Sequence, residues 1–304
     1  MVFNKKYLFI YLFLTWTLVS CGPSGNDKFL KLPPAATENL SDHILIASQL
    51  NQSVTLLKPD GSFLREIAIF DGTTADTPFG IGILDDENIA ISVDGVDRIA
   101  KANLSSGSKT DFIFNANLTG TMGNLTRLIN GDILVIETNN VERFTSSGTR
   151  IATGGWPLAL QTGGSGIEKI SAGGFVLCST TADRIRTYTD AGVGISALTA
   201  SGIGATTDAS DCATAVDGRI AVLWNGTTDT VRIFTDQTLS VVDCNFVNSA
   251  LLPNPLEIDF RPNGNALIAD GTNNIIVEID SDCNFVDHFS SLAVATPTGM
   301  KILP

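Results

Sequence analysis

The sequence repeats one short unit six times at a nearly constant spacing, and this period constrains the fold more than any other feature. In each unit a turn precedes a short hydrophobic strand, and successive strands begin 45, 44, 42, 45 and 46 residues apart. These strands begin at Ile44, Ile89, Ile133, Phe175, Ile220 and Ala266. Further strands and turns follow in most units, and an antiparallel four-stranded unit recurring roughly every 40 to 50 residues is typical of a propeller blade. The period therefore predicts an all-β, six-bladed β-propeller.

The segment PTGMKILP, at 297–304, indicates how the ring closes. It aligns with the strands that begin at Pro78 and Pro255, each of which stands 11 residues before the next strand of its blade. No such strand follows 297–304, and the first unit, at His43, has no proline-marked strand before it. Open strand edges invite aggregation, and closure removes them. We therefore expect the C-terminal strand to pair with the N-terminal blade, 43–70, as its innermost strand.

Two segments, 78–99 and 255–276, resemble NHL repeats, in which a proline and a glycine begin a strand and an Asp or Asn precedes the third strand. The likeness is good for these two blades, whereas the other four lack the proline and the aspartate. The resemblance implies the same propeller fold. It implies no single function, because the functions of NHL proteins diverge widely.

The first 20 residues are typical of a secretory signal peptide. Lys5 and Lys6 precede an uncharged, mostly apolar run at 7–20. A run of about 14 residues is shorter than the about 20 that span a bilayer core, and the basic start with small residues at its end is the pattern of a cleaved signal. We expect export of the chain.

The sequence LVSCG, at 18–22, resembles the lipobox of bacterial lipoproteins. The resemblance implies cleavage before Cys21 and attachment of lipid to its sulfur, and two or more acyl chains form a stable anchor. It also implies a place in the bacterial cell envelope, with Gly22 favouring the outer membrane. Residues 21–41 have no apolar period and are interpreted as a flexible tether, which leaves 42–304 for the propeller. The alternative is an ordinary signal peptide on a soluble secreted protein.

The charge of the chain argues against nucleic acid as a partner. It has 19 basic and 32 acidic residues, and loss of 1–20 would leave 17 against 32, a net charge near −15. Such a chain repels phosphate backbones, whereas nucleic-acid binding depends on neutralising them. An acidic surface favours cationic or polar partners.

Four cysteines lie in the predicted propeller: Cys178, Cys212, Cys244 and Cys283. Exported proteins meet an oxidising environment, so these residues are possible disulfide partners with three alternative connectivities. No C-x-x-C pair suggests a metal site. The sequence DCNFV occurs at 243–247 and 282–286, and we interpret this as similarity between neighbouring blades.

No catalytic, cofactor-binding or metal-binding residue can be assigned from motifs. The two histidines, His43 and His288, are not near a G-x-S-x-G elbow, which is absent, and there is no G-x-x-x-x-G-K-[ST] phosphate loop. We interpret both histidines as structural or surface residues.

We expect a monomeric, non-catalytic binding or scaffold module, because loops on a rigid ring are suited to recognition of a protein or a small polar ligand. Trp156 and Trp224 are candidate anchors on a binding face, although burial between blades is the more common place for such side chains. One alternative is a metal-dependent lactonase or sugar-acid hydrolase with Glu257, Asp259 and Asp208 lining the central channel. A second alternative is an accessory lipoprotein in outer-membrane assembly.

The lipobox assignment can be tested at Cys21. The Cys21→Ala variant should move from the membrane fraction to the soluble envelope fraction, because it lacks the sulfur that would carry the lipid. Ser24→Ala, three residues further on, is the matched control and should stay with the membrane. Fractionation followed by immunoblotting measures both, and an unchanged membrane fraction for Cys21→Ala would refute the anchor.

Overall fold

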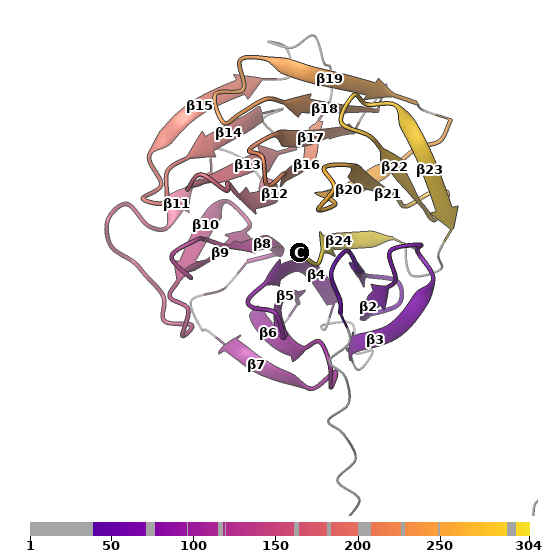
Figure 1. Cartoon of the computed structure of the whole chain (residues 1–304). Helices are drawn as coiled ribbons and strands as arrows, with labels where there is room; N and C mark the ends of the chain where they lie inside the picture. Colours follow the sequence, from indigo (N-terminus) through magenta and orange to yellow (C-terminus); the bar gives the residue numbers. More distant parts are fainter. Residues whose placement is uncertain are drawn as a thin grey trace, which may run out of the picture. The chain divides into compact units, whose positions relative to one another are not determined.

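The computed structural model describes residues 39–70, 77–95, 97–114, 118, 120–160, 164–180, 184–199, 208–225, 229–248, 250–290 and 296–304. The segment Leu40–Pro304 is one compact unit. It contains six antiparallel sheets of four strands each, arranged as blades around a centre (Figure 1). The predicted all-β, six-bladed propeller is confirmed. The predicted signal peptide, Cys21 and most of the tether lie outside the described residues.

In each blade the four strands follow one another from the centre of the ring outward. The first has β24 (Pro297–Ile302), β1 (Ile44–Ser48), β2 (Ser53–Leu57) and β3 (Phe63–Ile69). The second has β4 (Thr77–Ile83), β5 (Asn88–Asp94), β6 (Arg98–Asn103) and β7 (Lys109–Phe114). The third has β8 (Met122–Arg127), β9 (Ile133–Glu137), β10 (Asn140–Phe144) and β11 (Leu158–Ala159).

The remaining three blades follow the same plan. The fourth has β12 (Gly164–Lys169), β13 (Phe175–Ser179), β14 (Arg184–Tyr188) and β15 (Gly194–Thr199). The fifth has β16 (Asp208–Thr214), β17 (Ile220–Asn225), β18 (Thr230–Phe234) and β19 (Val242–Val247). The sixth has β20 (Pro255–Phe260), β21 (Ala266–Asp270), β22 (Ile275–Ile279) and β23 (Phe285–Ser290). Among the described residues, no helix is long and apolar enough to span a membrane.

The ring closes through β24, as predicted. This strand pairs antiparallel with β1, with Ile302 opposite Ile44 and Met300 opposite Ile46 (Figure 1). The Leu303 amide adds a hydrogen bond of 2.9 Å to the carbonyl of His43. The last strand of the chain therefore supplies the innermost strand of the first blade.

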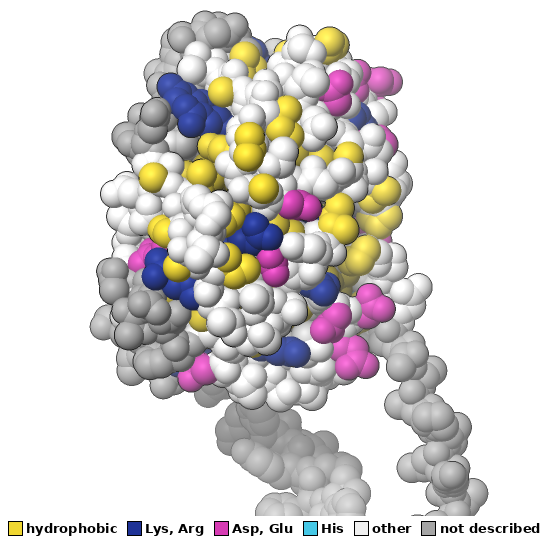
Figure 2. All heavy atoms as spheres, turned by 90° about the vertical axis from the view of Figure 1, so that its left-hand side faces the viewer, with side chains coloured by type: hydrophobic (Ala, Val, Ile, Leu, Met, Phe, Trp, Pro, Cys, Tyr) yellow, Lys and Arg dark blue, Asp and Glu magenta, His cyan; other side chains and the backbone are white. Residues whose placement is uncertain are grey.

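The hydrophobic core lies between the faces of neighbouring blades. One cluster joins Leu45 and Val54 of the first blade to Ile89 and Ile91 of the second. Strands such as β9 and β13 are buried along their whole length because the blade packs on both faces. This is why the repeating strands are continuous apolar runs. The outermost strands are more open, and apolar side chains remain on the outer surface among polar ones (Figure 2).

Every innermost strand has a shift of register close to its first residues. A bulge leaves a backbone N–H out of the ladder, and proline, which has no N–H, is tolerated there. Pro78, Pro255 and Pro297 occupy this place in β4, β20 and β24. The proline mark in the sequence is thus the mark of the bulge, and β8, β12 and β16 form the bulge without it.

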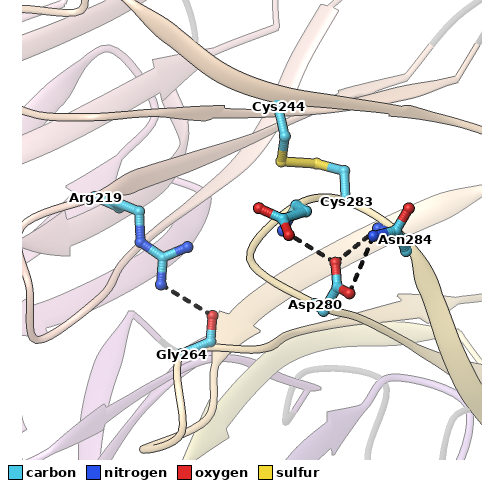
Figure 3. Close-up of a disulfide and its surroundings, with 7 residues drawn as sticks. Arg219, Cys244, Gly264, Asp280, Cys283 and Asn284 are labelled. Carbon is cyan, nitrogen blue, oxygen red and sulfur yellow. Dashed lines mark hydrogen bonds between the residues drawn. A yellow bond between two sulfur atoms is a disulfide. The ribbon is translucent and has the colours of Figure 1, made fainter.

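A disulfide joins the fifth and sixth blades (Figure 3). It links Cys244 of β19 to Cys283, in the turn before β23, with 5.6 Å between the Cα atoms. The Arg219 guanidinium connects the same two blades by donating to the carbonyl of Gly264 at 3.1 Å. Cys178 and Cys212 are free thiols, both buried. The paired DCNFV segments therefore place two sulfurs at the junction of neighbouring blades.

The tight contact that closes the ring can be tested at Gly299 of β24. A Cβ atom there would lie 2.6 Å from the carbonyl oxygen of Phe79 in β4. Gly299→Ala should therefore destabilise the protein by about 1 to 3 kcal/mol and lower its Tm by several degrees. Gly194→Ala in β15 is the control, because nothing lies within 4 Å of its Cβ position. Calorimetry measures both, and equal Tm values would contradict the close contact of β24 with β4.

Candidate binding site in the central channel

The innermost strands place two rings of equivalent positions around the central channel. Side chains two residues apart in a strand share a face. The outer ring is formed by the penultimate residue of each strand: Gly82, Thr126, Glu168, Ala213, Asp259 and Lys301. The inner ring lies two residues earlier: Gly80, Asn124, Gly166, Asp211, Glu257 and Gly299. Two contacts join strands that are not neighbours in the ring, Lys301 with Glu168 and Asn124 with Asp211. Side chains of both rings therefore meet inside the channel.

Lys301 spans the channel and forms an ion pair with Glu168. The two come from β24 and β12, which lie on opposite sides of the ring. The other Glu168 oxygen accepts hydrogen bonds from the hydroxyl of Thr126 and the amide of Lys169, both at 2.9 Å. Burial opposes the charge of Lys301, but the carboxylates of Glu168, Asp259 and Asp211 together raise its pKa well above the ordinary value. Lys301 is therefore a permanent cation.

Asp259 lies beside this pair and ties the last two inner strands together. Its Oδ2 accepts from the amide of Ile302 at 2.7 Å, and its Oδ1 accepts from the amide of Phe260 at 2.9 Å. Burial raises the pKa of Asp259 to about 6, although the charge of Lys301 acts in the opposite direction. The carboxyl group is thus held by fixed backbone donors in a site with little water.

Asp211 and Glu257 form a pair of carboxyl groups in the inner ring. Asp211 accepts from the amide of Ile258 at 3.0 Å and from the side chain of Asn124 at 3.4 Å. Burial raises the pKa of Asp211 to about 7, with Lys301 opposing the shift. Burial and the charge of Asp211 raise the pKa of Glu257 well above its usual range. Two buried carboxyl groups in contact cannot both ionise easily, so the pair retains a proton.

Glycine makes room for these groups. A Cβ atom at Gly166 would lie 2.4 Å from Oδ1 of Asp211. At Gly80 it would lie 2.8 Å from the Oδ1 of Asn124. The glycines of the inner ring therefore permit the polar side chains of the neighbouring strands to fill the channel.

The outer ring opens into a cavity of about 250 Å³ at the carboxyl ends of the inner strands. All six of those strands line it, through Gly82, Arg127, Lys169, Thr214, Phe260 and Lys301. Val216, 87% exposed, lies at its edge in the loop after β16. The Lys301 and Glu168 side chains are 13% and 10% exposed, so the ion pair borders the cavity.

The residues singled out from the sequence divide between this site and other places. Glu257 and Asp259 do face the channel, whereas Asp208 is exposed at the beginning of β16 and belongs to neither ring. Trp156 and Trp224 are buried, and so they are not exposed anchors of a binding face.

The two histidines lie outside both rings. His43 is buried just before β1, and His288 is exposed on the outermost strand β23. Sequence reasoning missed Lys301, Glu168 and Asp211. None of the three has a local mark of its own in the sequence, and each is located only by its position in an inner strand once the blades are aligned.

The carboxyl groups of the channel surround an ammonium group. In the described part of the chain, no group of three or more His, Cys, Asp and Glu side chains is arranged to hold a metal ion. Of the three acids expected to line the channel of a metal-dependent hydrolase, Asp259 accepts backbone hydrogen bonds with both oxygens and Glu257 lies beside Asp211. Asp208 is exposed outside both rings.

No protein-family model and no curated protein sequence matches the chain. Among solved structures, a chain of a nidogen/laminin complex matches with a TM-score of 0.67 and 13% identity, over 85% of this chain and 97% of that one. The WD40 β-propeller domain of Doa1 matches with 0.61 and 12%, over 86% and 83%. Virginiamycin B lyase from Staphylococcus aureus matches with 0.59 and 17%, over 75% and 74%. Such similarities establish the class of the protein as a β-propeller, and the likeness to NHL repeats stays a resemblance.

The raised pKa values predict how stability depends on pH. The folded pKa values of Asp211 and Asp259 are about 7 and about 6, above the ordinary 3.8. At pH values between the ordinary pKa and the raised one, the folded state binds more protons than the unfolded state. The free energy of unfolding should therefore fall as pH rises from about 4 to about 7, by at most about 1.4 kcal/mol per pH unit for each proton.

Asp211→Asn should flatten this dependence, because an amide releases no proton. Asp236→Asn is the control: the hydroxyl and amide of Thr238 lower the pKa of this exposed carboxyl, so it titrates below that window. Urea unfolding at several pH values measures the slopes. A wild-type protein that gains stability over the same range would contradict the proposed protonation of the channel.

Proposed function

We propose that the chain is a lipid-anchored binding protein of the bacterial cell envelope, and that its propeller recognises a small polar ligand at the mouth of the central channel. The anchor and the location are supported by the signal-like start of the sequence and by the lipobox resemblance at 18–22. The observation that carries the binding role is the cavity of about 250 Å³, to which all six inner strands contribute.

The construction of this cavity supports recognition. Its polar groups lie on strands of a closed ring, so their positions are set before a ligand arrives and little entropy is lost on binding. Concave sites with a few placed polar groups are also where small ligands usually bind. The neighbouring structures include a lyase and a chain from a protein complex, so the shared architecture alone does not select a function.

The hydrolase alternative is less well supported by the geometry. A catalytic metal would require carboxylates that converge on an open position. Here the Lys301 ammonium lies beside Glu168, and both oxygens of Asp259 accept backbone hydrogen bonds. This arrangement favours the binding role, for which the charged groups need only hold their positions.

The proposal can be tested by blocking the mouth. Val216→Trp adds an indole at the edge of the cavity, whereas Val193→Trp adds one at an exposed site, 63% accessible, outside the cavity lining. Thermal-shift measurements should use small carboxylates, phosphates, amines and neutral sugars. At least one class should raise the Tm of the wild type and of Val193→Trp but not of Val216→Trp.

Two results would overturn the proposal. One is a panel in which no class stabilises the wild type. The other is a stabilisation that persists in Val216→Trp, which would place the ligand elsewhere on the protein.

A further inference from the structure

We propose that the ligand at the channel mouth is a small organic anion, bound through its carboxylate or phosphate oxygens by the ammonium groups of Lys169 and Lys301. This inference rests on the proposed function and specifies the chemistry of the same cavity. It follows from which hydrogen-bonding groups of the cavity lining already have partners in the protein and which do not.

Each carboxylate oxygen of the lining already accepts at least one hydrogen bond. Glu168 accepts from Thr126, from the amide of Lys169 and from Lys301. Both oxygens of Asp259 accept from backbone amides, at 2.9 and 2.7 Å. A ligand that offers mainly donors would find few side-chain acceptors there that lack a partner.

Donors, in contrast, remain. Within the described residues, the Lys169 ammonium makes no hydrogen bond or ion pair, and its side chain is exposed at the end of β12. Lys301 has three N–H groups, and its one hydrogen bond within the described part of the chain goes to Glu168. An anion would supply the acceptors that these ammonium groups lack, and such charge-assisted hydrogen bonds are among the strongest.

The local charge agrees with this account although the whole chain has a net charge of −13. Four basic side chains line the cavity, Arg127, Lys169, Arg261 and Lys301, against the two acids Glu168 and Asp259. Arg261 is paired with Asp42 and Glu278, and Arg127 donates to the carbonyl of Leu84. These two arginines therefore contribute charge at the rim, while the two lysines retain donors for a ligand.

Two further features of the cavity suit a small ligand. The cavity of about 250 Å³ has room for a small molecule. This suits a molecule the size of a four-carbon dicarboxylate. The side chains of Ile83, Val216 and Phe260 offer apolar surface for its carbon skeleton.

The test is calorimetric titration of the purified propeller at low salt with three probes: succinate, inorganic phosphate and putrescine, a diamine with the charge of succinate reversed. Succinate or phosphate should bind, and Lys169→Gln should weaken that binding about tenfold by removing one charge-assisted contact. Lys58→Gln removes one positive charge from an exposed site outside the cavity and should bind as the wild type does. Circular dichroism checks that both variants are folded.

Each outcome decides the inference. The tighter of the two anions identifies whether carboxylate or phosphate oxygens are preferred. Tighter binding of putrescine, no binding of either anion at millimolar concentration, or equal affinity in Lys169→Gln overturns the anion assignment. If putrescine binds more tightly than both anions and Val216→Trp abolishes its binding, the anion assignment fails while the proposed function stands. If the bound probe is unaffected by Val216→Trp, both fail.

Discussion

The pairing of β24 with β1 is the constraint on which the rest of the structure depends. It converts a row of repeats into a closed ring, and closure holds six inner strands side by side around one channel. The same strand carries Lys301, the one basic residue among the twelve positions of the two channel rings. Its ammonium reaches Glu168 on the opposite strand, and its next residue, Ile302, donates to Asp259. The strand that closes the ring therefore also brings the charged groups of the site together.

The contents of the channel are costly for the stability of the fold. Removing charged groups from water costs several kcal/mol each, and their mutual attraction repays this only with good geometry and further hydrogen bonds. The protein supplies these through backbone amides to Asp211 and Asp259 and through the Thr126 hydroxyl to Glu168. Retained protons reduce the remaining cost. Perturbed pKa values of this kind cluster at functional sites, which is in keeping with a channel that serves recognition.

The fold was predictable from the sequence because its signals are local. Turn residues and a short apolar run indicate each blade. Pro78, Pro255 and Pro297 mark the bulge of three inner strands. The site was predictable in part, for the same reason. Glu257 and Asp259 follow a marking proline within five residues, so their strand could be located.

The rest of the site lacked such a signal. Glu168 and Asp211 lie in β12 and β16, whose bulges form without proline, so the sequence offers no reference point from which to number their positions. Lys301 lies in a strand marked by a proline, but a metal site in the channel predicts acids and amides there and no lysine. The overall charge was also a poor guide to the mouth, because four basic side chains gather there from strands and loops that are distant in the sequence.

The sequence by itself determined the number of blades, their order and the strand that closes the ring, because these follow from spacings within each repeat and from matches between repeats. Only the tertiary structure decided which charges meet. Lys301 and Glu168 are 133 residues apart and belong to opposite blades, so no local pattern records their contact. Their pairing, and the cavity above it, exist because the six inner strands surround one axis and place their penultimate residues at the same level.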